Sequence, residues 1–212
     1  MTENEIESRN YHYSSFNTKR VGKTSLVVRY IGKMFSHHIS PTIGASFFTC
    51  NINVDDTRVR LQVWDTAGQE RFRSMAPMYY RNANAALLVF DITQQTSFAS
   101  IKSWVKELQR NVEEPLVLCV VGNKTDLESQ RKVTREEAEQ YATSIAATYF
   151  ESSALNDSGI EDVFLCCASG MITLSQDKLV KTLRVTPLNQ EREGSRNQLH
   201  QLPVNEKPPL CC

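Results

Sequence analysis

The sequence predicts an α/β fold in which a mostly parallel central sheet carries helices on both faces. Two observations support this prediction. From about residue 22 onward, strand-like and helix-like segments alternate along the chain. Two of the strand-like segments, 85–91 and 116–121, are continuous apolar runs, which are typical of parallel strands buried on both faces.

Each expected element follows from a local pattern. The segment 96–112 repeats apolar residues at helical spacing, and Thr134 is followed three residues later by Glu137, which is a capping-box signature. The acidic pair Asp55-Asp56 forms a turn between two strand-like segments. In chain order we expect a helix at 22–31, strands at 47–54, 58–64 and 85–91, a helix at 96–112, a strand at 116–121, a helix from 134, a strand at 149–152 and a closing helix from 159 to about 176.

Length and composition limit the class of protein. The 212 residues favour one domain with a tail over two full domains. Lys and Arg number 24, as do Asp and Glu, so no basic surplus points to a nucleic-acid partner. The polar and acidic N-terminus does not resemble a signal peptide, and no apolar run is long enough to span a membrane.

Four cysteines lie within apolar-patterned segments, and no cysteine pair has zinc-finger spacing with partner histidines. We therefore expect Cys50, Cys119, Cys166 and Cys167 to be buried thiols of a reduced compartment. Beyond Asp177 the apolar pattern fades into polar residues and prolines, which are typical of a flexible tail. The sequence thus predicts an atypical segment at 1–20, a folded domain at 21–176 and a tail at 177–212.

The first motif is the second half of a phosphate-binding loop, at the start of the expected helix. Backbone N–H groups and the positive end of a helix favour phosphate oxygens. Lys23 would add a full charge at the β and γ phosphates, and Thr24 would offer its hydroxyl to Mg²⁺. A chance Gly-Lys-Thr in a loop is the alternative for this motif alone. The candidate phosphate-binding residues are Val21, Gly22, Lys23, Thr24 and Ser25.

A second motif, Asp-Thr-Ala-Gly-Gln-Glu at 65–70, follows the strand that ends at Trp64. Asp65 at the carboxyl end of a strand can hold Mg²⁺ through water, and Gly68 lets its backbone N–H approach a γ-phosphate. Gln69 could orient an attacking water and is the candidate catalytic residue. An acidic turn is a poor alternative for the whole run.

The third motif, Asn-Lys-Thr-Asp at 123–126, follows the buried strand and points to a guanine ring. The carboxylate of Asp126 can accept hydrogen bonds from the N1–H and the exocyclic amine of guanine, and adenine lacks that donor pair. Residues Ser153, Ala154 and Leu155 lie where a backbone N–H could meet the guanine O6. Asn123 and Lys124 complete the candidate base site.

In this order and spacing, the motifs resemble the Ras superfamily from Val21 to about Gln176, and specifically the Rab family of small GTPases. Residues 40–47, Ser-Pro-Thr-Ile-Gly-Ala-Ser-Phe, resemble the first Rab switch, and residues 76–81, Ala-Pro-Met-Tyr-Tyr-Arg, resemble the end of the second. The likeness is strongest to the endosomal Rab branch. It implies a P-loop GTPase that cycles between GTP and GDP forms with Mg²⁺, hydrolyses GTP slowly and recruits effectors in vesicle and endosomal trafficking.

The resemblance also implies roles for single residues and partners. Thr42 would bind Mg²⁺ and sense the γ-phosphate, and Phe35 would stack against the guanine edge. The expected partners are an exchange factor, a GTPase activator, escort or GDI-type lipid-binding proteins and effectors, acting on a monomer at the cytoplasmic face of endosomal membranes with a cytosolic pool. The residues implied to contact effectors are Ile43, Phe47, Trp64 and Tyr79. For the three aromatic residues, packing in the core is the alternative.

The ending Pro-Pro-Leu-Cys-Cys resembles the terminus on which Rabs carry geranylgeranyl groups. Cys211 and Cys212 are therefore the lipidation candidates. Two lipid chains give stable membrane anchoring where one chain gives only marginal binding. Two unmodified thiols are the alternative.

The opening segment departs from the family pattern, which begins with a strongly apolar strand and a loop whose first residue is Gly. Here residues 11–16 are Tyr-His-Tyr-Ser-Ser-Phe, and the loop begins at Asn17. Either this segment still fills the central strand position, or the first central strand is degraded or missing. One explanation is that residues 1–20 come from an alternative start, such as a variant transcript.

The loop itself also departs from the pattern. Asn17 is the most tolerable non-Gly residue if a positive φ is needed there. The charge of Lys19 and Arg20 could aid phosphate binding, but their bulk should obstruct Gln69 and an incoming arginine, so we predict weakened hydrolysis. Leu155 replaces the lysine common at its position. A hydrolysing switch and a non-enzymatic, GTP-binding or nucleotide-free adaptor both remain open, and Asp126 argues against a third reading, a P-loop ATPase.

Overall fold

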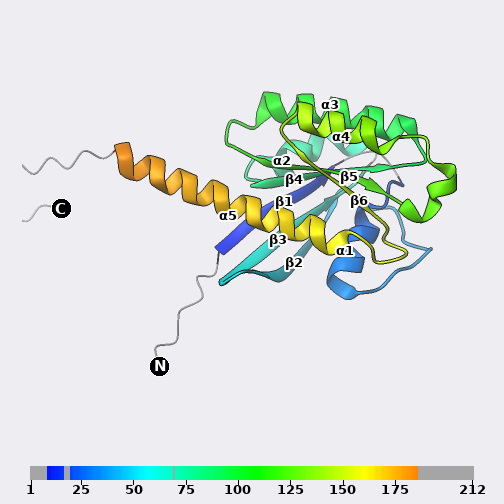
Figure 1. The fold of residues 1–212 in the computed structure, drawn as a ribbon, viewed down its shortest axis with the longest axis horizontal. Coiled ribbons are helices and arrows are strands. Elements are labelled where there is room, and N and C mark those ends of the chain that lie inside the picture. Colours follow the sequence, from blue (N-terminus) through cyan, green and yellow to red (C-terminus); the bar gives the residue numbers. More distant parts are fainter. Residues whose placement is uncertain (1–8, 17–19, 69, 186–212) are drawn as a thin grey trace, which may run out of the picture.

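The computed structural model describes residues 9–16, 20–68 and 70–185, and it is built around a six-stranded sheet in the order β2-β3-β1-β4-β5-β6 (Figure 1). The β2–β3 pair is antiparallel and the other neighbouring strands are parallel. The α/β prediction is therefore confirmed. The strands are β1 (Arg9–Phe16), β2 (Ala45–Val54), β3 (Thr57–Thr66), β4 (Ala85–Asp91), β5 (Val117–Asn123) and β6 (Thr148–Ser152).

The opening segment fills the central strand position, so of the two alternatives the first holds and the missing strand does not. β1 lies between β3 and β4, with its backbone in register from Arg9 opposite Val59 to Ser15 opposite Asp65. The physical reason is backbone hydrogen bonding. Without β1, the inner edges of β3 and β4 would leave buried N–H and C=O groups unpaired, at about 1–3 kcal/mol each. The residues of β1 belong to the segment 1–20 that the sequence predicts to be atypical.

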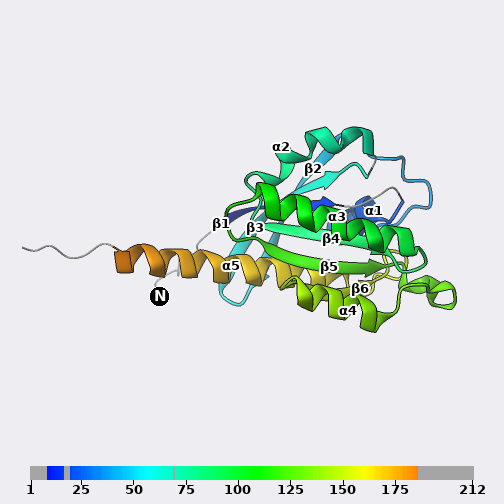
Figure 2. The same cartoon turned by 90° about the horizontal axis from the view of Figure 1, so that it is seen from above.

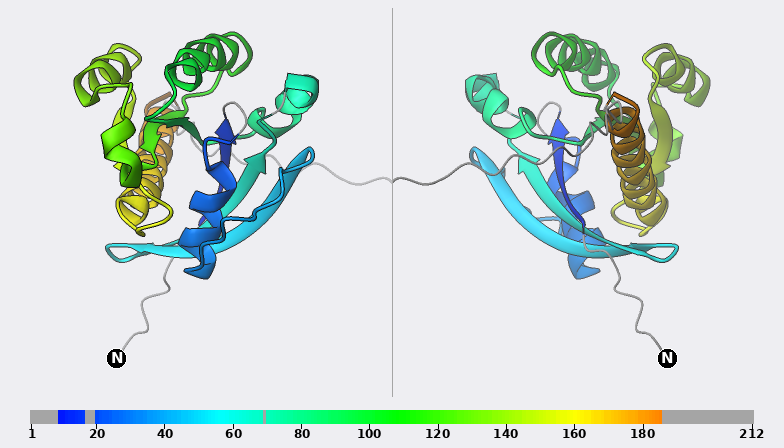
Figure 3. Two further views of the ribbon diagram at one scale, coloured as in Figure 1. Left: turned by 90° about the vertical axis from the view of Figure 1, so that its right-hand side faces the viewer. Right: turned by 90° about the vertical axis from the view of Figure 1, so that its left-hand side faces the viewer.

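Helices cover both faces of the sheet (Figure 3). On one face, α1 (Lys23–Gly32) and α5 (Ile160–Val185) pack on β3, β4 and β5. On the other face, α2 (Ala76–Tyr80), α3 (Gln95–Asn111) and α4 (Arg135–Ser144) pack on β4 and β5. All seven residues of β4 are buried, as its continuous apolar run predicts.

Two helices differ in how well their ends were predicted. Thr134 caps α4 as expected, because its side chain accepts a hydrogen bond from the backbone N–H of Glu137 at 3.1 Å. Helix α5 ends at Val185 rather than at about Gln176, and its last turns project beyond the sheet (Figure 2). Among the helices that the structure describes, none combines the length and apolar character of a membrane span. The 3-10 helices η1 (Glu70–Met75) and η2 (Thr125–Gln130) were not predicted.

The four cysteines within the described residues carry free thiols. Cys119 and Cys167 are buried, as expected, and their sulfur atoms lie 3.4 Å apart between β5 and α5. The prediction of burial is wrong for Cys50 and Cys166, which are half-buried. Cys50 lies on β2, the edge strand of the sheet, where one side has no neighbouring strand to cover it.

Candidate functional site

The parallel strands end at one edge of the sheet, towards the right of Figure 1, where a cavity of about 840 Å³ opens. This volume is typical of small-molecule sites. Residues far apart in the sequence line the cavity because parallel strands bring their carboxyl ends together. The lining comes from residues within 20–25, 35–42, 66–68, 123–127 and 154–155.

The structure brings the predicted nucleotide-binding residues together at this cavity. Asp65 and Ser153 stand directly behind the lining and are fully buried. The residues that line the cavity are Val21, Gly22, Lys23, Thr24, Ser25, Phe35, Thr42, Gly68, Asn123, Lys124, Asp126, Ala154 and Leu155.

The phosphate-loop motif enters α1 through Gly22, which has a φ of 92°. A Cβ at this position would overlap the side-chain amide of Asn123, so both the backbone conformation and the available space require glycine. The same Asn123 amide donates a hydrogen bond to the carbonyl of Val21 at 2.9 Å. The first and third motifs are therefore tied directly to each other.

Lys23 opens α1 and is 6% exposed. Burial lowers the pKa of its ammonium to about 8, and the nearby carboxylate of Asp65 acts in the opposite direction. A buried cation of this kind favours a negatively charged ligand in the adjoining cavity, because the ligand would replace the lost hydration.

Three side-chain oxygens converge beside Lys23. The Thr24 hydroxyl donates to Oδ2 of Asp65 at 2.6 Å, and the Thr42 hydroxyl reaches the same oxygen at 3.1 Å. The two hydroxyls lie 2.9 Å apart. Mg²⁺ is typically held by few protein oxygens together with water and substrate phosphates, and this donor set fits it. No cluster of three or more His, Cys, Asp or Glu suited to a metal occurs in the described part of the chain.

The carboxylate of Asp126 also lines the cavity. The Ser153 hydroxyl donates to its Oδ1 at 2.5 Å, and the backbone N–H of Asn156 donates to the Ser153 oxygen at 3.1 Å. Lys124, which has a φ of 71°, forms a 2.6 Å ion pair with the buried Asp91 at the end of β4. The contacts of Ser153 hold the carboxylate at the cavity wall through its Oδ1.

Arg20 lines the cavity next to the phosphate loop, and its exposed side chain stands on a backbone with a φ of 65°. From the sequence, a positive φ was considered only at Asn17. Both Asn17 and Lys19 lie outside the described residues. The candidate catalytic Gln69 and the lipidation candidates Cys211 and Cys212 also lie outside them.

The predicted effector residues form one surface over β2, β3 and α2. The Phe47 and Trp64 ring centroids are 4.9 Å apart, and those of Trp64 and Tyr79 are 5.5 Å apart. Phe47 is 49% exposed and Ile43 is 77% exposed, so for Phe47 the core-packing alternative does not hold. Sequence reasoning missed Met78, which is 76% exposed beside Tyr79.

Sequence reasoning also missed Arg29, which lies on α1 outside the cavity lining. Its guanidinium donates to the carbonyls of Ala154 at 2.7 Å and Leu155 at 3.1 Å. No local signal could have found it, since these two partners are more than a hundred residues further along the chain. The buried Asp91 had a signal, namely an acid at the carboxyl end of an apolar strand.

Comparison with known proteins finds relatives that all belong to the Ras-related proteins. Residues 17–173 match the Ras family. The human Ras-related protein Rab-21 is 48% identical over 156 residues, which cover 74% of this chain and 69% of that protein. Human Rab-31 is 49% identical over 144 residues, 68% of this chain and 74% of its own length. RabJ of Dictyostelium discoideum is 40% identical over 188 residues, covering 88% of this chain and 73% of that protein.

Proposed function

Because the chain belongs to the Rab small GTPases of the Ras family, we propose that it is a guanine-nucleotide switch that recruits effectors in vesicle and endosomal membrane trafficking. One observation carries the proposal for this chain's own residues. A single cavity is lined both by the carboxylate of Asp126 and by a buried lysine, Lys23, beside which three side-chain oxygens converge.

At the proposed base site, Ser153 occupies one oxygen of the Asp126 carboxylate. That oxygen keeps a second lone pair and Oδ2 keeps both, so the carboxylate can still accept the N1–H and the exocyclic amine of guanine. Adenine would leave the charge unpaired, which rejects it strongly. Phe35 lines the same cavity and offers an apolar face to the ring.

At the proposed phosphate site, Lys23 would pair with the β and γ phosphates, and Thr24, Thr42 and Asp65 would hold Mg²⁺, the last of them through water. When bound, the cation would neutralise charge on the phosphate oxygens. Thr42, which now hydrogen-bonds to Asp65 and lies beside the Thr24 hydroxyl, would be one of the residues that hold the cation.

The switch would work through two segments that already touch. The backbone N–H of Ala67 donates to the carbonyl of Gly44 at 2.8 Å, which joins the segment after Thr42 to the segment before Gly68. GTP would hold Thr42 and Gly68 through its γ-phosphate, and hydrolysis would release both. The exposed Ile43 and Phe47 and the half-buried Trp64 and Tyr79 adjoin these segments, so effectors could read the ordered form. Prenyl groups on Cys211 and Cys212 would anchor the switch to the membrane.

The altered loop supports weakened hydrolysis as part of this proposal. Arg20 places a long cation beside Gly22 at the edge of the cavity, where an activator's arginine and Gln69 would need room. A non-Gly residue with a φ of 65° also costs about 1 kcal/mol or more. The obstruction by Arg20 favours the second candidate function, a non-enzymatic adaptor that binds GTP without hydrolysing it or holds no nucleotide.

The test is to purify the full chain, release any bound nucleotide and identify it. We expect GDP or GTP, loss of the nucleotide on chelation of Mg²⁺, and preference for GDP over ADP in competition. Single-turnover phosphate release then separates a switch from an adaptor, because an adaptor releases no phosphate. A folded chain that binds guanine and adenine nucleotides equally, or binds neither, contradicts the proposal.

A further inference from the structure

Arg29 joins two parts of the molecule that are distant in sequence, the segment around the end of α1 and the loop at 154–155. It lies on α1, six positions after Lys23, and its half-buried guanidinium spreads over several acceptors. Besides the carbonyls of Ala154 and Leu155, Nη1 donates to the carbonyl of Lys33 at 3.1 Å. The charged group also stands 5.7 Å from the ring centroid of Phe35, within the range of a cation–π contact.

The two carbonyls that Arg29 holds belong to the loop between β6 and α5. In a trans peptide the C=O and the following N–H point in opposite directions, and no cis peptide occurs among the described residues. By fixing the Ala154 carbonyl, Arg29 therefore also fixes the direction of the Leu155 N–H. The Ser153 carbonyl accepts from Ser158 N–H at 3.2 Å, which fixes the Ala154 N–H in the same way. These are the N–H groups expected to meet the guanine O6.

A continuous chain of hydrogen bonds runs from Arg29 to the carboxylate that would read the base. Arg29 binds the Leu155 carbonyl, and the N–H of the same peptide group, on Asn156, binds the Ser153 hydroxyl oxygen. The Ser153 hydroxyl donates to Asp126. A shift of the Leu155–Asn156 peptide would therefore be passed through Ser153 to the carboxylate.

We infer that Arg29 is a positioning residue for guanine recognition, which holds the Ser153–Leu155 loop, and through it Asp126, in the geometry that fits the base. This inference rests on the proposed guanine-nucleotide function. Arg29 touches no ligand itself, because it stands outside the cavity lining and acts through backbone groups. It also links base reading to α1, the helix that begins at the phosphate loop.

The guanidinium fork is required for this role. The two carbonyls of successive residues accept from Nε and Nη2, which are held in one plane. A lysine ammonium would keep the charge but is a point donor on a flexible stem, so it cannot hold both carbonyls in fixed directions. Arg29→Lys should therefore behave more like Arg29→Ala than like the unchanged protein.

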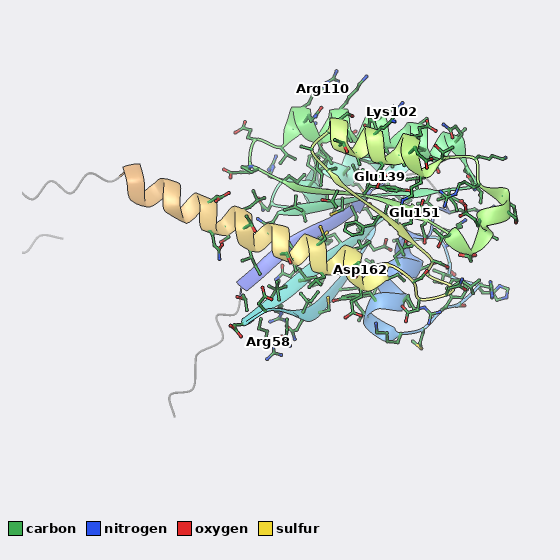
Figure 4. All side chains as sticks on the ribbon, viewed as in Figure 1. Arg58, Lys102, Arg110, Glu139, Glu151 and Asp162 are labelled. Atoms are coloured by element: carbon green, nitrogen blue, oxygen red, sulfur yellow. The ribbon has the colours of Figure 1, made fainter. Side chains whose placement is uncertain are left out.

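The experiment compares GDP with inosine diphosphate, which keeps the O6 and N1–H but lacks the exocyclic amine read by Asp126. Equilibrium affinities are measured for the full chain and for Arg29→Ala, Arg29→Lys and Lys102→Ala. Lys102 is a matched control, because its ammonium also lies over aromatic rings, 5.9 Å from the Phe98 centroid, but on α3 away from the cavity (Figure 4).

We expect both Arg29 variants to weaken GDP binding by about tenfold or more, as for the loss of charge-assisted hydrogen bonds, and to weaken inosine diphosphate by less. The preference for GDP should fall, while Lys102→Ala leaves both affinities within about twofold. Equal losses for the two nucleotides, or GDP binding within about threefold of normal in Arg29→Ala, would overturn the inference. If the unchanged protein does not prefer GDP to ADP, the proposed function fails instead.

Discussion

Replacing Asp126 with Asn exchanges one oxygen of the cavity-wall carboxylate for an amide while keeping the size of the side chain. In the proposed function the carboxylate accepts two hydrogen bonds from guanine. Hydrogen bonds to a charged group contribute about 1.5–3 kcal/mol each, so their loss amounts to about 3–6 kcal/mol. The affinity for GDP should therefore fall roughly 10²- to 10⁴-fold.

The structure also predicts a gain. Xanthine carries a carbonyl where guanine has its exocyclic amine, and the new amide could donate to that carbonyl. The Ser153 hydroxyl, now 2.5 Å from Asp126 Oδ1, can donate equally well to an amide oxygen, so the side chain should keep its orientation. Asp126→Asn should therefore bind xanthosine diphosphate better than the unchanged protein does, which shows that the variant is folded.

The assay is equilibrium competition among GDP, ADP and xanthosine diphosphate. Asp157→Asn is the matched control, because Asp157 is exposed outside the cavity lining and its φ of 57° suits Asn. This control should leave all affinities unchanged. If Asp126→Asn binds GDP within threefold of the unchanged protein, the carboxylate does not read the base and the assignment of the base site is wrong.

Three further predictions concern the fold, a thiol and the altered loop. Gly122→Ala would place a Cβ 2.8 Å from the Tyr149 hydroxyl, so we expect a loss of about 1–3 kcal/mol and a Tm lower by several degrees, whereas Gly32→Ala, with its nearest atom 3.5 Å away, should cause no loss. Burial raises the pKa of the Cys50 thiol from 9.0 to about 11, so little of it is thiolate at pH 8. Iodoacetamide at pH 8 should therefore alkylate Cys50 about a hundredfold more slowly in the folded protein than in urea. Equal rates in the two conditions would contradict this. Arg20→Gly should remove the strained φ and raise single-turnover hydrolysis; an unchanged rate would show that Arg20 is no obstacle.

Local sequence patterns were sufficient for much of the fold. The continuous apolar run of β4 and the Thr134 cap of α4 act within a few residues, so their physical causes are visible in the sequence itself. The extra turns of α5 beyond Gln176 were missed because the apolar pattern weakens there, and a helix once started extends at little cost for each further residue.

Some residues of the candidate site were predictable from the sequence, and others appear only in the folded structure. Motif residues such as Lys23 and Asp126 carry their chemistry in side chains at fixed spacing, so their assembly at the carboxyl edge of the sheet was predictable. Arg29 acts on backbone carbonyls, which every residue possesses. Nothing in the identity of Ala154 or Leu155 signals such a partner, so only the folded chain shows it.

The central strand shows most clearly how non-local forces decide local structure. The polar and aromatic run at 11–16 lacks the aliphatic pattern of a buried parallel strand, and judged alone it predicts a gap in the sheet. β3 and β4 each have a row of buried backbone N–H and C=O groups along the edge that faces β1. Single side chains cannot form hydrogen bonds with all of these groups, whereas a neighbouring strand can. Any extended segment of suitable length relieves that cost, and β1 does so in register with both neighbours. The position of β1 follows from its neighbours' backbones, and that pairing brings the chain to the edge of the sheet where residues 20–25 line the cavity.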